Sequence, residues 1–288
     1  MMGELFDDPE LRPAFLSLSS GSSGNCYFLG RFRGRECVGG LLIDAGVSLK
    51  RLKQVLETEG ISTDCIDAVL VTHDHMDHIR SLASYCKKLH KPVWTSRTIA
   101  QALAGRTYHL SGVGVCPDEL VQGEWNLISG FAVKYFVVPH DATETVGYFI
   151  EMPLGASAHR FFIMTDAGRV TDEAVEYASM ADTVVFESNY DMDMLLGGPY
   201  PAELKRRIMD GNGHLSNDEC ASAIKRFCHS GLRNVFLCHL SDNNNTPRRA
   251  WETSEAALDE LCGMGRIEKG AVSLRPLPRT SSSGLISL

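Results

Sequence analysis

Short runs of β-branched and aromatic residues alternate with segments of helical spacing along most of this 288-residue chain. Short apolar runs bounded by turn residues are typical of strands, whereas apolar residues three and four positions apart are typical of helices. The pattern predicts strands at residues 15–19, 26–30, 41–44, 66–71, 92–95, 131–139, 146–151, 160–165, 183–187 and 234–238. It predicts helices at residues 49–59, 79–89, 98–103, 172–179, 202–209, 216–228 and 251–262.

The alternation continues without repeats or an internal linker, so we expect one domain over residues 1–288, with a core at about residues 14–265. The first two strands are predicted to form a hairpin around a Gly/Ser turn. Ser216 and Glu219 match a capping box that opens the following helix. The Ser/Gly-rich tail at 279–288 is predicted to be mobile.

Four strong metal ligands stand directly after the predicted strand at 66–71. They are His73, His75, Asp77 and His78, in the sequence T-H-D-H-M-D-H-I. A strand end is rigid, and the loop after it lets the chain fold around an ion. Imidazole and carboxylate groups suit zinc, iron or manganese. The spacing therefore predicts a metal site rather than a polar loop with incidental histidines.

Three further predicted strands end at a potential ligand. His140, Asp166 and His239 each follow an apolar run of β-branched and aromatic residues. A single histidine after a strand is more often structural than a ligand. Together with the first cluster, however, these residues complete a set for two metal ions. Cys238, beside His239, is expected to point the other way, into the core.

The order H-x-H-x-D-H, His, Asp, His resembles that of the metallo-β-lactamase superfamily of hydrolases, and the match covers roughly residues 15–240. The sequence L-L-I-D-A-G at 41–46 matches the early strand of that superfamily. Three more motifs are similar to its YycJ (also called WalJ) family, namely S-S-G-S-S-G-N at 19–25, E-S-N-Y at 187–190 and G-H-L-S-N at 213–217.

This resemblance implies an α/β (α+β) fold, the αββα four-layer sandwich, with a dinuclear site at the shared edge of two β-rich halves. It also implies 5′-to-3′ exonuclease action on DNA. A water held between two divalent ions (zinc, manganese or iron) would lose a proton near neutral pH and become the nucleophile. We assign the first ion to His73, His75 and His140 and the second to Asp77, His78 and His239, with Asp166 bridging both.

Asp77 and His214 are the candidate catalytic residues. His214 stands just before the helix that opens at Ser216, and a helix N-terminus favours a phosphate. His214 would therefore contact the scissile phosphate or protonate the leaving oxygen. An ordinary surface histidine before a helix is the alternative.

Several other residues are candidates for supporting the ligands or the substrate. Asp44 is predicted to orient a ligand histidine by a hydrogen bond, unless it only forms the turn before Ala45-Gly46. An ordinary tight hairpin would also explain the polar turn near the start of the chain. The candidates from this turn and from the motif at 187–190 are Ser22, Ser23, Asn25, Glu187 and Asn189.

The composition suits a soluble globular protein, since 44% of residues are hydrophobic and 22% are charged. No apolar run is long enough to span a membrane. The acidic start at residues 1–8 lacks the features of a secretory signal. Nine cysteines, Cys116 among them, show no paired spacing, which favours free thiols in a reducing cytosol. We therefore expect a cytoplasmic protein without a membrane partner.

The formal net charge of −8 is unusual for an enzyme that binds nucleic acid. Two divalent ions would add four positive charges where the scissile phosphate binds. Basic residues also cluster at 50–53, 87–91, 205–207 and 248–249. We therefore expect binding to nucleic acid that is weak and sensitive to salt.

Several functions remain open from the sequence. The preferred one is a phosphodiesterase acting on the ends of DNA or RNA, with DNA preferred; the alternative is a hydrolase of a lactone, a thioester or a small cyclic phosphodiester. A di-iron redox protein would carry Glu at the position of His75 and an added flavin domain. An intact ligand set argues against a non-catalytic binding protein. The stretch from Asp166 to His239 is too short for a large accessory domain, and protein partners are not indicated.

Overall fold

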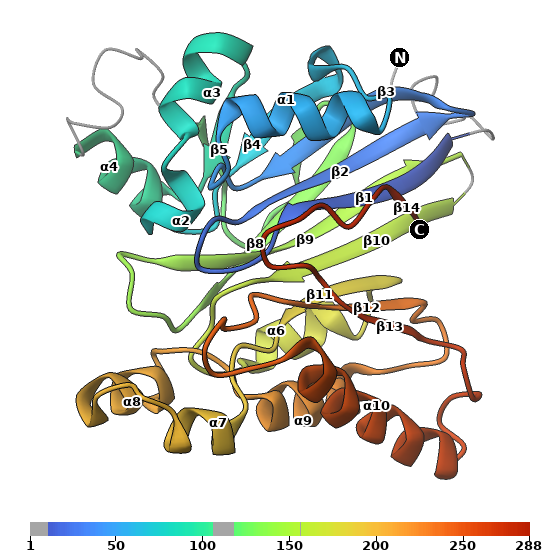
Figure 1. Ribbon diagram of the computed structural model, residues 1–288. Helices are drawn as coiled ribbons and strands as arrows, with labels where there is room; N and C mark the ends of the chain where they lie inside the picture. Colours follow the sequence, from blue (N-terminus) through green and yellow to red (C-terminus); the bar gives the residue numbers. More distant parts are fainter. Residues whose placement is uncertain (1–10, 106–117, 156) are drawn as a thin grey trace.

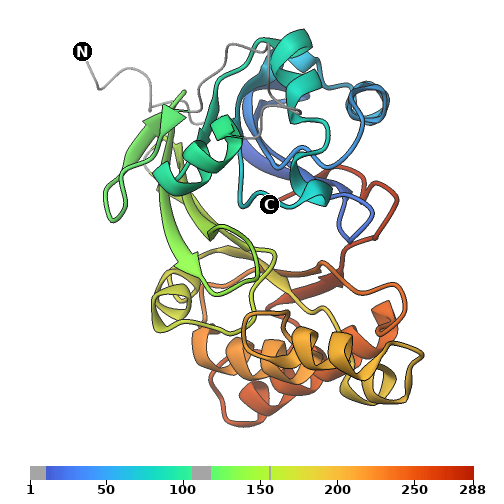
Figure 2. The same ribbon diagram turned by 90° about the vertical axis from the view of Figure 1, so that its left-hand side faces the viewer.

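The computed structural model describes residues 11–105, 118–155 and 157–288. Within these residues, two seven-stranded sheets lie face to face, and helices cover the outer face of each (Figure 1; Figure 2). This arrangement is the αββα sandwich that the resemblance implies. The acidic start of the chain and Cys116 lie outside the described residues.

The first sheet comes mainly from the N-terminal part of the chain. Its β1–β2 and β2–β3 pairs are antiparallel, so the predicted hairpin is confirmed, and β3, β4, β5 and β6 are parallel. In spatial order its strands are β14 (Ile286–Ser287), β1 (Leu11–Ser19), β2 (Cys26–Arg33), β3 (Glu36–Ile43), β4 (Ile66–Leu70), β5 (Val93–Thr95) and β6 (Asp118–Glu119).

The second sheet comes from the C-terminal part of the chain. The strands predicted at 146–151 and 160–165 pair with each other in the antiparallel β9–β10 pair, where Ile150 faces Phe161. The four strands from β10 to β13 run parallel. In spatial order the strands are β13 (Ser273–Pro276), β12 (Asn234–Cys238), β11 (Thr183–Glu187), β10 (Ser157–Met164), β9 (Thr145–Leu154), β8 (Phe131–Val138) and β7 (Asn126–Ile128).

The helices form the two outer layers (Figure 1). On the first sheet lie α1 (Leu49–Thr58), α2 (Met76–Ile79), α3 (Leu82–Leu89) and α4 (Arg97–Gly105), with a 3-10 turn η1 (Thr63–Cys65). On the second lie α6 (Asp172–Ala178), α7 (Met192–Gly197), α8 (Ala202–Met209), α9 (Asn217–Phe227) and α10 (Pro247–Gly263). The predicted capping box of Ser216 and Glu219 is formed at the start of α9. None of the described helices is long and apolar enough to cross a membrane.

The main core lies between the two sheets. The ring of Phe15 on β1 lies 5.3 Å from those of Phe161 on β10 and Phe236 on β12, so aromatic side chains join the layers. A second core lies between the outer face of the second sheet and the helices that cover it, where the ring centroids of Phe186 and Phe227 are 5.4 Å apart. Fully burying one such side chain contributes about 1.5–3 kcal/mol. Strands buried on both faces explain why the sequence shows continuous apolar runs.

The helix predicted at 79–89 is wrong in one respect, because the chain forms two helices, α2 and α3, instead of one. The amide of Ser81 donates to the carbonyl of Ala45 at 3.0 Å rather than continuing the helix. This long-range bond ties the helix pair to the loop after β3. No local signal in the sequence indicates it.

The mobile tail predicted at 279–288 is also wrong. Residues of the tail form β14, in which Ile286 pairs with Phe15 and Ser287 with Ala14. The amide of Ser283 also donates to the carbonyl of Ser17 at 2.9 Å. Backbone pairing needs no apolar pattern, so a Ser/Gly-rich composition does not exclude an edge strand.

Candidate metal centre

The candidate ligands gather where strands of both sheets end. His73 follows β4, His140 follows β8, Asp166 follows β10 and His239 follows β12. Four of the candidate ligands line a pocket of about 300 Å³, namely His75, Asp77, Asp166 and His239. The structure therefore brings together all seven residues that the sequence predicts as ligands, which are His73, His75, Asp77, His78, His140, Asp166 and His239.

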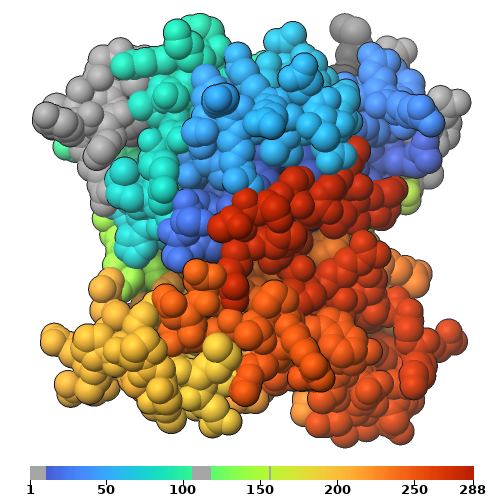
Figure 3. Space-filling model, in the orientation of Figure 1, coloured from blue at the N-terminus to red at the C-terminus, as the bar shows by residue number. Residues whose placement is uncertain are grey.

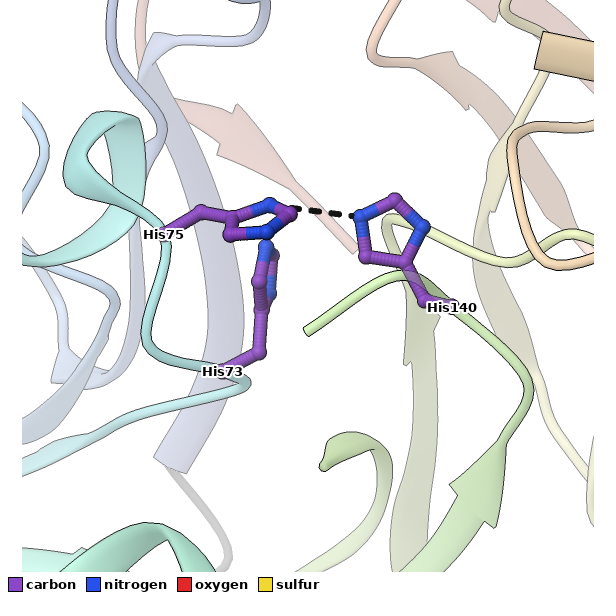
Figure 4. A group of neighbouring side chains, drawn as sticks. All are labelled: His73, His75 and His140. Atoms are coloured by element: carbon purple, nitrogen blue, oxygen red, sulfur yellow. Dashed lines mark hydrogen bonds between the residues drawn. The ribbon is translucent and has the colours of Figure 1, made fainter. Parts of the chain in front are cut away.

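The first ligand group consists of His73, His75 and His140, each with a ring nitrogen within 4.8 Å of the others. Figure 4 shows the three rings converging, with Nε2 of His140 3.3 Å from Nδ1 of His75. Nδ1 of His140 donates to the carbonyl of Gly213 at 2.7 Å. That bond leaves Nε2 as the nitrogen that faces the group.

The orientation of His73 is fixed through Thr72. The Thr72 hydroxyl donates to the carboxylate of Asp44 at 2.8 Å, so its oxygen is free to accept from Nδ1 of His73 at 3.0 Å. Nε2 of His73 then keeps its lone pair for a cation. Burial lowers the pKa of His73 well below its usual value, and burial likewise lowers the pKa of His140. Both rings are therefore neutral at neutral pH, as metal binding requires.

The second ligand group consists of Asp77, His78 and His239. Oδ2 of Asp77 lies 3.5 Å from Nε2 of His78 and 3.7 Å from Nε2 of His239. On its other side, His78 donates from Nδ1 to Asp44 at 2.7 Å. Asp44 thus makes a hydrogen bond to a candidate ligand histidine, and neither side chain of this pair is exposed.

Carboxylates dominate the electrostatics of the second group. Burial works to lower the pKa of His78, but Asp44 and Asp166 raise it to about 10. Burial also opposes the charge on His239, yet Asp166, Asp77 and Glu187 raise its pKa well above its usual value. Without a metal, both rings hold a proton at neutral pH. A bound cation would take the place of those protons.

Asp166 lies between the two groups. Its Oδ2 is 3.2 Å from Nε2 of His78, whereas its Oδ1 is 3.8 Å from Nε2 of His140 and 3.2 Å from Nδ1 of His239. Burial works to raise the pKa of Asp166, but His239 and His78 hold it well below its usual value. The carboxylate is therefore charged and faces both groups, as a bridging ligand must.

The residues fit a pair of cations. Among the described residues, eleven buried side-chain polar atoms have no hydrogen-bond partner, and three of them are Nε2 of His73, Oδ2 of Asp166 and Nε2 of His239. Buried polar atoms are nearly always paired in folded proteins, since an unpaired one costs roughly 1–3 kcal/mol. All three belong to predicted ligands: His73 is in the first group, His239 is in the second, and Asp166 lies between the two groups. A bound cation would satisfy them.

The loop after β3 is held in a conformation that few residues adopt. Asp44 has a φ of 62°, in the left-handed region. The next glycine, Gly46, is required by close approach, because a Cβ there would lie 1.7 Å from the carbonyl of Asp77. The D-A-G sequence therefore lets the chain pass directly beside the metal loop.

Only some residues of the polar turn at 22–25 lie at the site. Asn25 is buried, and its amide donates to Oδ2 of Asp77 at 3.2 Å and lies 2.9 Å from Nε2 of His78. Ser22 lines the pocket. Ser23 is exposed and does not line the pocket, so the structure does not bring it to the ligands. Asn189 supports His239 from behind, donating to its carbonyl at 2.8 Å.

Glu187 connects the second group to His214. It is fully buried at the end of β11, and its Oε1 accepts from Nδ1 of His214 at 2.8 Å and from Nδ1 of His239 at 3.0 Å. Burial opposes the charge on His214, but Glu187 raises its pKa. His214 is partly exposed in the pocket wall, and Nε2 is the nitrogen left to face a ligand there.

The pocket also contains an ion pair that was not predicted from the sequence. Arg207 on α8 pairs with Asp141, and both line the pocket. Oδ1 of Asp141 lies 3.4 Å from Nε2 of His140. Arg207 is the one Lys or Arg side chain among the described residues that line this pocket. The only signal in the sequence is its place in the basic run at 205–207.

Comparison with known proteins identifies the family. The model of the beta-lactamase superfamily domain matches residues 40–239, and the chain belongs to this superfamily, in its metallo-β-lactamase branch. The chain is 30% identical over 248 residues to exodeoxyribonuclease YycJ of Bacillus anthracis, covering 85% of this chain and 89% of that protein. It is 31% identical over 238 residues to exodeoxyribonuclease WalJ of Streptococcus pneumoniae, covering 82% and 84%.

A solved structure shows the same fold at lower identity. The metallo-β-lactamase fold protein YhfI from Bacillus subtilis superimposes with a TM-score of 0.66 at 14% sequence identity, covering 94% of this chain and 98% of that one. The predicted sandwich and the YycJ/WalJ resemblance are therefore both confirmed.

Proposed function

We propose that this protein is a metal-dependent exonuclease that hydrolyses phosphodiester bonds at DNA ends, removing nucleotides from the 5′ end in the cytoplasm. One observation carries the proposal: two ligand groups share Asp166 and open into a pocket that also contains His214. The named activity of the YycJ and WalJ relatives supports DNA as the substrate.

The first and second ligand groups would each hold one divalent ion, zinc, manganese or iron, with Asp166 shared between them. Two such ions would lower the pKa of a bound water and offset the charge of the phosphate. The protein contributes fixed donor atoms, since Thr72, Gly213 and Asp44 hold His73, His140 and His78 in place. Ligands held in this way lose little freedom when an ion binds.

His214 acts as the general acid in this proposal. Glu187 raises the pKa of His214, which favours the protonated ring, and accepts from Nδ1, which fixes the orientation of the ring. Nε2 can then donate its proton to the oxygen of the leaving nucleotide as the phosphodiester bond breaks. Glu187 accepts from both His214 and His239 and holds both rings in one orientation.

Arg207 provides a basic contact for the phosphate in a protein whose net charge is acidic. Its guanidinium is bound to Asp141 by a side-chain pair in which Arg207 is 62% exposed, so the pair is weak and open to exchange. The planar fork of a guanidinium binds phosphate as well as carboxylate. A backbone phosphate entering the pocket would therefore replace Asp141 as the partner of Arg207.

The test is digestion of a DNA duplex labelled at either end, followed over time with a panel of divalent metals. Stepwise shortening from the 5′ end is expected, with RNA of the same sequence cut more slowly. The His75→Ala variant is expected to abolish the activity, because it removes a ligand of the first group. Turnover of a lactone, a thioester or a cyclic phosphodiester, with no nucleic acid cut under any metal, would replace this function with the small-molecule alternative.

A further inference from the structure

The C-terminal strap, residues 277–288, joins the two sheets beside the ligands. It continues from β13 at the edge of the second sheet and ends in β14 at the edge of the first (Figure 1). Figure 3 shows this red segment crossing the surface from the lower half of the molecule to the upper half. One short segment therefore connects the edge strand of the second sheet to the edge of the first.

Within the strap, Arg279 holds the loop that follows His239. Its guanidinium donates to the carbonyl of Leu240 at 3.1 Å, to the carbonyl of Asn245 at 2.7 Å and to the carboxylate of Asp242 at 3.1 Å. The planar guanidinium can make all three bonds at once, whereas a lysine ammonium cannot match that geometry. The loop from 240 to 245 is thereby fixed from outside.

The backbone of Arg279 holds the opposite side of the site. Its carbonyl accepts from the hydroxyl of Ser19 at 2.7 Å and from the amide of Ser20 at 3.2 Å. The hydroxyl of Ser20 in turn accepts from the amide of His239 at 3.0 Å. Arg279 and Ser20 thus close a ring of hydrogen bonds around the backbone of His239.

This ring surrounds a residue in an unfavourable conformation. His239 has a φ of 53°, in the left-handed region, which is uncommon for residues other than glycine, although His adopts it more often than most. Such a conformation persists only where the surroundings over-determine it. The constraints here are the Ser20 bond to its amide, the Asn189 bond to its carbonyl and the Arg279 bond to the next carbonyl.

We propose that Arg279 is a positioning residue for the second ligand group, and that the C-terminal strap locks His239 in its metal-binding conformation. The inference rests on the proposed function to the extent that His239 binds a cation. It assigns a role to a segment outside the residues matched by the family model, which end at residue 239.

The experiment compares full-length wild-type protein with the Arg279→Ala, Arg279→Lys and Arg275→Ala variants. Arg275→Ala is the matched control, because Arg275 lies on β13 and its side chain bonds to Ser273, away from the site. Binding of zinc and of manganese is titrated by calorimetry, and metal-free melting temperatures are recorded beside it. A His239→Ala variant marks which binding step belongs to the second group.

The expected result is that Arg279→Ala binds the first metal like wild type and the second about tenfold more weakly. Arg279→Lys is expected to lie between the two, with a loss of about threefold. If Arg279→Ala does not fold, the metal affinity of Arg279→Lys tests the inference instead. Arg275→Ala is expected to match wild type at both steps.

Wild-type affinity at both steps in a folded Arg279→Ala protein would overturn the inference, even if the melting temperature falls, since the strap would then only stabilise the fold. If Arg279→Ala does not fold, wild-type affinity in Arg279→Lys would overturn it equally. In both cases the proposed function stands. Wild-type protein that takes up neither zinc nor manganese would overturn the inference and the proposed function together.

Discussion

The first and second ligand groups are built largely from histidine, but their surroundings differ. In the first, Nδ1 of His73 meets the hydroxyl of Thr72 and Nδ1 of His140 meets a backbone carbonyl. In the second, Nδ1 of His78 meets the carboxylate of Asp44, and Nδ1 of His239 meets that of Glu187. At these Nδ1 atoms, the partners are a hydroxyl and a backbone carbonyl in the first group and carboxylates in the second.

As a consequence, the histidines of the two groups differ in how readily they are protonated. Burial lowers the pKa of His73 and His140, so these rings are free to bind a cation at neutral pH. In the second group, carboxylates outweigh burial and raise the pKa of His78 to about 10. The first group is therefore prepared for metal, whereas the second must release protons when it binds one. The comparison shows that partners behind a ligand, and not the ligand type, set how a site responds to pH.

Removing the residue shared by both groups should have the largest effect. Asp166→Ala is expected to lose metal from both groups, because the carboxylate faces each of them and screens the repulsion between two cations. Hydrolysis should fall by at least about a thousandfold. Elemental analysis and turnover measure this, with Asp172→Ala, an exposed aspartate on α6, as the control. If Asp166→Ala retained two metals, Asp166 would not be a ligand that both ions need.

Removing His214 should separate the chemistry from metal binding. His214→Ala is expected to keep both metals and the fold but to lose about a hundredfold in kcat, because a general acid is missing. Metal content and single-turnover rates on DNA are measured beside His90→Ala, an exposed histidine that does not line the pocket. Unchanged turnover of phosphodiesters in His214→Ala would mean that His214 is an ordinary wall residue.

The pH dependence of metal affinity tests the comparison itself. His78 has a pKa of about 10 in the metal-free protein, so at any lower pH the second metal must displace its proton. Affinity at this step should rise about tenfold per pH unit for each proton displaced between pH 7 and 9. The first step should be nearly flat there, because the pKa values of His73 and His140 lie below their usual range.

Titration calorimetry at several pH values measures both steps. Asp44→Asn serves as the internal check, because loss of the carboxylate lowers the pKa of His78 and should flatten the second slope. Equal slopes for both steps in wild-type protein would contradict the difference between the two groups.

The smallest expected effect concerns Arg207, at the edge of the first group. Arg207→Ala should raise KM for DNA severalfold, leave kcat nearly unchanged and make the salt dependence of binding shallower by about one phosphate contact. Arg206→Ala is the matched control, because its neighbouring side chain on α8 does not line the pocket. Equal KM values for the two variants would exclude the proposed phosphate contact.

The sequence allowed the ligands to be predicted because their signals are local. An apolar strand followed at once by His or Asp is visible in the chain at His73, His140, Asp166 and His239. The capping box at Ser216 is local for the same reason. The αββα fold could be predicted because the ligand order resembles a known superfamily.

What supports the ligands could only partly be predicted. Asp44 was identified through its place after a strand, but the Thr72 bridge to His73 depends on tertiary contact between two loops. The tail at 279–288 has no apolar pattern, so its pairing with β1 and the role of Arg279 could not be inferred from composition. Ser23 shares a motif with Asn25, yet only the structure shows that it is exposed.

The most direct test of the account is the number of metal ions that each chain binds. Protein purified without chelator, and metal-free protein titrated with zinc or manganese, should reach two ions per chain. His75→Ala and His239→Ala should each lose one binding step, and not the same one. Absence of any metal in the purified protein, together with no uptake when zinc or manganese is added, would contradict the account.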